Sequence, residues 1–173
     1  MHVFVDESVR SDAYLLAAAL VRDTELDRTR AGLRDLRRPG QRRVHFAKEG
    51  NPRRREILSA LAGAGLRARI YSCGGRPTDA REACLLALIA DIVPAGARRL
   101  VLESRETMNH QDLRVINAAL RKHGEQRLEY LHLRPEEEPV LWVADAVAWA
   151  VGAGGDWRRR VAPLLDGHVR LRP

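Results

Sequence analysis

The stretch from Val140 to Val151, VLWVADAVAWAV, is the part of the sequence that most limits how the chain can fold. Apolar side chains occupy every side of a helix drawn through it, whereas a surface helix keeps one polar face. The run falls well short of the roughly 20 apolar residues that cross a bilayer. We therefore expect a helix at the centre of the core, with the rest of the chain packed around it.

Strand and helix patterns alternate along the rest of the chain. Apolar or alternating runs predict strands at 2–8, 13–21, 66–73, 100–102 and 128–133, and a short extended piece at 43–48. Capping residues and prolines predict further helices that start near Thr24, Asn51, Ala83 and Asn109. The prediction is one α/β domain, 1–173, with a mixed sheet covered by helices. Its opening strands are antiparallel, and its later strands are parallel through helical crossovers.

Composition narrows the classes of protein. The chain has 173 residues and is 45% hydrophobic, enough for a real core. Two cysteines are too few for a disulfide framework or a zinc site. No secretory or membrane-spanning segment is evident, so we expect a cytoplasmic protein without a membrane partner. The net charge of +7, carried almost wholly by arginine, favours nucleic acid as a partner. GC-rich coding explains the arginines equally well.

The first strand ends in two adjacent acids, Asp6 and Glu7. Because side chains alternate along a strand, Asp6 lies on the side of Phe4 and Glu7 on the side of Val5. At most one acid can therefore face a given site, and we expect it to be Asp6. Glu7 is then a supporting residue or points to solvent. A polar turn that merely ends a buried strand is the alternative.

Two further acids stand in apolar surroundings. Asp145 is the only acid of the helix at 140–151, and an unpaired buried carboxylate costs several kcal/mol. A metal ion would compensate for that cost, as would a backbone amide or an arginine. Glu103 ends the strand at 100–102 just as Asp6 ends the first strand. If these strands are parallel neighbours, the two acids meet at one sheet edge. Glu106 is a possible substitute for Glu103.

Three acids on separate elements form the ligand set that Mg2+ or Mn2+ prefers. We therefore predict a metal site made by Asp6, Glu103 and Asp145. Such an ion generates hydroxide from water and stabilises charge on phosphate oxygens. His45 and His132 are candidates for a proton shuttle or a phosphate donor, although a single histidine on a strand is commonly structural.

Three segments together resemble a bacterial and phage protein family of unknown function. These segments are Phe4-Val5-Asp6-Glu7-Ser8, Val44-His45-Phe46-Ala47 and Leu141 to Ala150. Family members open on a strand ending in Asp-Glu-Ser-Gly, carry a His-Ala-type segment and close with a helix that contains Ala-Asp. The resemblance implies a ribonuclease H-like fold with metal-dependent nuclease activity.

Residue by residue, the resemblance implies Asp6 and Asp145 as metal ligands and Glu7 and His45 as further site residues. Two positions depart from the family pattern. Val9 stands where glycine is usual, which changes the turn after the acids. Glu103 stands where aspartate is more typical, and its longer side chain would shift the metal unless the strand is set back.

The leading prediction is a nuclease that cleaves phosphodiester bonds of RNA or DNA with Mg2+ or Mn2+. A catalytically inactive nucleic-acid-binding or regulatory module on the same fold is the alternative. A phosphatase or transferase acting on small phosphoesters would use the same metal chemistry. The oligomeric state stays open, and a homodimer is possible because Trp142 and Trp149 on one helix leave apolar surface for a partner.

Overall fold

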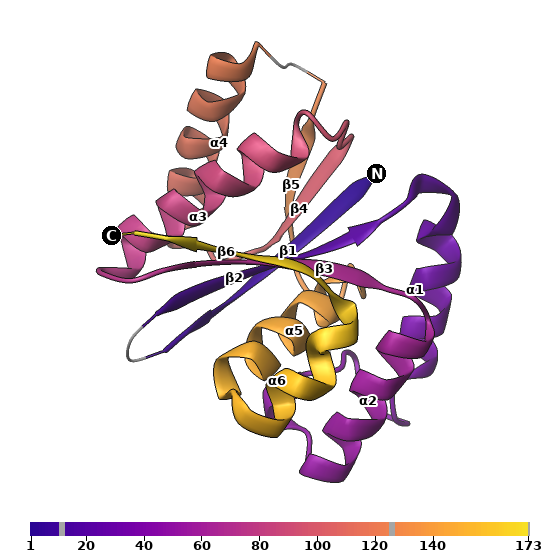
Figure 1. Cartoon of the computed structure of the whole chain (residues 1–173). Helices are drawn as coiled ribbons and strands as arrows, with labels where there is room; N and C mark the ends of the chain where they lie inside the picture. Colours follow the sequence, from indigo (N-terminus) through magenta and orange to yellow (C-terminus); the bar gives the residue numbers. More distant parts are fainter. Residues whose placement is uncertain (11–12, 125–126, 173) are drawn as a thin grey trace.

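The computed structural model describes residues 1–10, 13–124 and 127–172. Within these residues a six-stranded sheet has the strand order β5-β4-β1-β2-β3-β6 (Figure 1). Its strands are β1 (His2–Val9), β2 (Tyr14–Val21), β3 (Arg67–Cys73), β4 (Arg99–Glu103), β5 (Glu129–Leu133) and β6 (Leu165–Leu171). The turn expected between β1 and β2 includes residues 11 and 12, which lie outside the described residues.

The sheet is mixed, as predicted. β1 pairs antiparallel with β2, and β2 pairs antiparallel with β3. The pairs β1–β4, β4–β5 and β3–β6 are parallel. Since β1 and β4 are adjacent and parallel, their carboxyl ends lie at the same edge of the sheet, where open α/β sheets place their sites.

Helices cover both faces of the sheet (Figure 1). One face carries α3 (Pro77–Ile92) and α4 (Asn109–His123). The other face carries α1 (Leu26–Asp35), α2 (Asn51–Gly63), α5 (Leu141–Ala153) and α6 (Gly155–Val161). Short 3-10 helices are η1 (Asp23–Glu25), η2 (Phe46–Lys48) and η3 (Ala162–Leu164).

The central position of α5 is confirmed. Val143, Ala144 and Val147 are fully buried and belong to the same apolar core as Phe4 of β1. Val3 and Val5 belong to a second core, on the side of α3 and α4. The alternation of β1 therefore separates the two cores, and it sends consecutive side chains to opposite faces of the sheet.

Three parts of the chain differ from the prediction. No element is predicted after residue 151, but this part of the chain contains α6 and β6. β6 is an edge strand beside β3 whose residues are mostly half-exposed, so it lacks the continuous apolar run of a central strand. The piece at 43–48 is not extended throughout, since η2 begins at Phe46. α3 begins at Pro77 rather than near Ala83, because proline is favoured in a first helical turn.

Among the described residues, no helix has both the length and the apolar character needed to cross a membrane.

Candidate active site

Asp6 and Glu103 lie on neighbouring strands at the same sheet edge. Val5 of β1 is opposite Leu102 of β4, so the acids that follow them are placed side by side. The Glu103 side chain is close enough to Asp6 to raise the pKa of Asp6 both by hydrogen bonding and by its charge. Two carboxyl groups can form such a bond only when one of them holds a proton. The contact expected between these acids is therefore present.

Burial raises the pKa of Asp6, which is only 8% exposed, to about 10. The hydrogen bond and negative charge of Glu103, and the charge of Asp145, act in the same direction, while Arg105 opposes them. Asp6 consequently holds a proton at neutral pH. A cation among these carboxylates would reverse the effect, because it favours their charged forms.

Asp145 reaches the same place from the middle of α5. Burial raises the pKa of Asp145, and the nearby charge of Glu103 adds to this effect. Three groups oppose this rise in pKa. They are a hydrogen bond from the backbone N–H of Phe46 and the charges of His45 and Arg43. The Phe46 N–H donates to Oδ2 of Asp145 at 3.0 Å. The backbone-amide partner considered as an alternative thus accompanies the carboxylate cluster.

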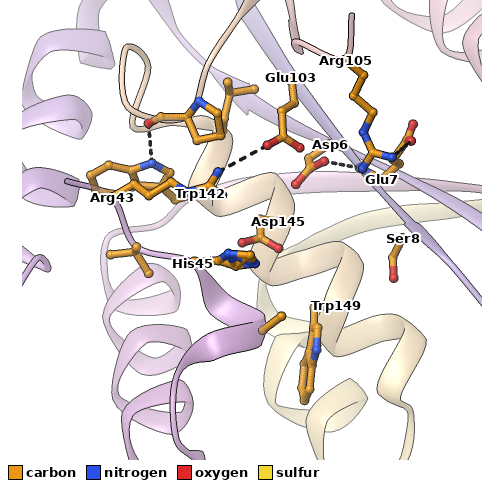
Figure 2. A pocket seen from close by; sticks show the side chains of 14 residues that line it. Asp6, Glu7, Ser8, Arg43, His45, Glu103, Arg105, Trp142, Asp145 and Trp149 are labelled. Carbon is orange, nitrogen blue, oxygen red and sulfur yellow. Dashed lines mark hydrogen bonds and ion pairs between the residues drawn. The ribbon is translucent and has the colours of Figure 1, made fainter. Parts of the chain in front are cut away.

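A cavity of about 270 Å3 opens between the ends of β1 and β4 and the helix α5. Figure 2 shows Asp6, Glu103 and Asp145 around it, each from a different element. Its lining also includes His45, Arg43, Arg105 and Trp149. The three predicted metal ligands therefore share one concave site.

His45 also faces this cavity. Its Nδ1 atom is buried and has no hydrogen-bond partner among the described residues. Buried polar atoms of this kind are uncommon, because an unmade hydrogen bond costs about 1–3 kcal/mol. The ring therefore has one nitrogen whose hydrogen bond is not made within the described part of the chain.

Glu7, although it lines the cavity, is held in a buried ion-pair network. Its Oε1 pairs with Arg105 at 2.6 Å, and its Oε2 contacts both Arg81 and the hydroxyl of Tyr14. Its side chain is 7% exposed, so the expectation that it might point to solvent is wrong. Alternation directs it toward the second core, where these cations neutralise it. Both of its oxygens are occupied, so we do not assign Glu7 a role in the reaction.

His132 belongs to the same network and not to the cavity lining. Its Nε2 lies 3.0 Å from Oδ2 of Asp112, which also accepts a hydrogen bond from Arg81 at 2.7 Å. Burial alone would raise the pKa of Asp112, but these partners hold it below its ordinary value. Glu106 is exposed and outside the cavity lining. Of the two acids considered at the end of β4, only Glu103 reaches the site.

Two arginines of the site were not predicted. Arg43 lies 3.4 Å from Glu103 and the same distance from Glu136. Arg105 is 43% exposed and anchored by Glu7. Both come from loops, and nothing in a sequence this rich in arginine distinguishes them from other surface residues. Their guanidinium groups give the cavity a positively charged rim beside its carboxylates.

The carboxylates of Asp6, Glu103 and Asp145 are oxygen ligands of the kind that a hard divalent ion prefers. Three carboxylates with few compensating cations lie together, two of them with raised pKa values. Their present arrangement is not that of a bound ion: within residues 1–10, 13–124 and 127–172, no three His, Cys, Asp or Glu side chains are grouped to hold one. Glu103 is turned toward Asp6 and Arg43 instead.

No protein-family model and no curated protein sequence matches this chain. Among solved structures, it is similar to ribonuclease HII from Archaeoglobus fulgidus, seen in a complex with PCNA. The similarity has a TM-score of 0.56 at 18% sequence identity, and it covers 86% of this chain and 70% of the archaeal one. The likeness shows that this chain has a ribonuclease H-like fold.

Proposed function

We propose that this chain is a nuclease that hydrolyses phosphodiester bonds of RNA or DNA with Mg2+ or Mn2+ held by Asp6, Glu103 and Asp145. One observation carries the proposal: these acids, from β1, β4 and α5, face one cavity, and burial raises the pKa of Asp6 and Asp145. The ribonuclease H-like fold and the resemblance of the opening and closing segments to the bacterial and phage family favour a nuclease over an enzyme of small phosphoesters.

Each group at the cavity has a part in this proposal. A bound divalent ion activates water and stabilises charge on phosphate oxygens. Arg43 and Arg105 supply planar cations that suit phosphate oxygens. His45 lines the cavity, and its imidazole ring is the candidate for proton transfer. The net charge of +7 favours a polyanionic substrate over a small neutral one.

A catalytically inactive nucleic-acid-binding module is the second candidate. The observation in its favour is that Glu103 bonds to Asp6 and Arg43, and no metal-binding group is preformed in the described part of the chain. This candidate predicts binding through arginines that weakens as salt rises, with no metal-dependent cleavage.

The Asp145→Asn substitution tests the nuclease, because it removes a charge while keeping the size of the side chain. We expect Mn2+ to raise the melting temperature of the wild type and to support cleavage of RNA or DNA, and the variant to lose both responses. Glu106→Gln is the matched control, since that exposed acid lies outside the cavity.

Unchanged cleavage by the Asp145→Asn variant would refute the assigned site. Stabilisation of the wild type by Mn2+ without cleavage of either nucleic acid would favour the inactive module. Circular dichroism of each variant shows whether the fold is retained, so a loss of activity can be assigned to the site.

A further inference from the structure

Beside the cavity lies a strip of two tryptophans and two arginines, Trp149, Trp157, Arg54 and Arg55. Trp149 lines the cavity and follows Asp145 by one turn of α5, so the two share a helix face (Figure 2). Trp157 of α6 meets Trp149 with ring centroids 5.5 Å apart and planes at 79°. Both indoles are half-buried. The strip therefore continues from the carboxylates onto the surface of α6.

A guanidinium group from α2 lies over each indole ring. Arg54 lies 4.3 Å from the centre of the Trp149 ring, and Arg55 lies 5.8 Å from that of Trp157. Arg54 also donates to the backbone oxygens of Phe46 and Ala47, at 3.0 and 2.6 Å. The N–H of the same Phe46 holds Asp145. The cation of Arg54 is thus held in a defined position relative to the carboxylates.

The charge of the strip is not neutralised by the fold. α2 and α6 together carry six arginines and two acids, and each acid pairs with another arginine of its own helix. Within the described residues, no carboxylate lies at ion-pair distance from Arg54 or Arg55. Fixed cations beside aromatic rings, next to a site that would cleave phosphodiesters, complement a polyanion whose bases can stack.

We propose that this strip binds a single-stranded stretch of the nucleic acid next to the bond to be cleaved. A base stacks on Trp157, and phosphates contact Arg54 and Arg55. This inference rests on the proposed nuclease function and specifies its substrate as single-stranded at this position.

A base that stacks on Trp157 must come from a single strand. Bases inside a duplex are stacked on one another, so neither of their faces is free to lie against the indole ring. Unpaired bases can be splayed apart and stacked singly on aromatic or guanidinium planes. Contacts of this kind tolerate any base, so the strip contributes affinity for single strands without sequence preference.

The test is fluorescence anisotropy with a labelled single-stranded oligonucleotide and its duplex, in EDTA so that no cleavage is needed. We expect the wild type to prefer the single strand. Trp157→Ala should weaken that binding about 5- to 150-fold, the range for one lost stacking contact. Arg55→Ala should weaken it and lower the salt-dependence slope by about 0.7, the value for one phosphate contact on a single strand.

Arg121→Ala is the control, because it removes the same charge from the exposed surface of α4, on the opposite face of the sheet. The inference is overturned if a folded Trp157→Ala variant and the Arg55→Ala variant both bind the single strand like the control. It is also overturned if the wild type prefers the duplex. The nuclease proposal fails separately from this inference. It fails if the wild type does not cleave nucleic acid in Mn2+, whatever the anisotropy measurements show.

Discussion

Asp6→Asn should stabilise the metal-free protein, although it removes a proposed catalytic ligand. In the folded chain Asp6 is buried, bonded to Glu103 and near the charge of Asp145, which raise its pKa to about 10. The folded state therefore takes up a proton that the unfolded chain releases. Asparagine donates a hydrogen bond to Glu103 without needing that proton.

The size of the effect follows from the two pKa values. Between the ordinary value of 3.8 and the folded value of about 10, each rise of one pH unit destabilises the folded state by about 1.4 kcal/mol. This cost is absent below the ordinary pKa and grows as the pH rises. Near neutral pH its upper limit is about 4 kcal/mol. Because Asp6 titrates together with a neighbouring group, we expect a gain in unfolding free energy of about 2–4 kcal/mol.

Urea denaturation in EDTA measures this difference, at about pH 5, 7 and 9. The advantage of the Asp6→Asn variant should increase with pH, because only the wild type must take up the proton. Mn2+ at a hundred times its Kd should then add about 2.7 kcal/mol to the wild type and nothing to the variant. A variant that is less stable at every pH, or whose advantage does not grow with pH, would refute this account of the carboxylate pair.

Two further substitutions separate supporting residues from reacting ones. Glu7→Gln removes the carboxylate that Arg81 and Arg105 share, although Arg81 keeps its ion pair with Asp112. It should lower the unfolding free energy by about 1–3 kcal/mol in urea while the Mn2+-induced rise in melting temperature persists; loss of that rise with normal stability would instead make Glu7 a ligand. His45→Gln should reduce cleavage about 100-fold or more at saturating Mn2+ with little change in melting temperature, and a wild-type rate would exclude proton transfer by its ring.

The predictable part of the fold was set by patterns within single elements. The uniformly apolar run at 140–151 could only be a buried helix, and the apolar runs ending in Asp6 and Glu103 could only be interior strands. β6 escaped prediction because an edge strand needs no such run, and its pairing with β3 joins residues far apart in the chain.

Part of the candidate site was also predictable from patterns within single elements, and part of it was not. Alternation along β1 separated Asp6 from Glu7, and parallel neighbouring strands brought Asp6 to Glu103. The partners of these acids were not predictable. Arg43 and Arg105 come from loops, and no local period determines where a loop side chain points.

The sequence by itself determined which side of its element each acid occupies, because periods of 2 and 3.6 residues follow from backbone geometry alone. Tertiary structure decided what those acids meet. It buried Glu7 against Arg81, set the Phe46 N–H on Asp145, and placed α2 and α6 so that Arg54 and Arg55 lie near the two indoles. These contacts join segments distant in the chain, so only the packing of the helices on the sheet could establish them.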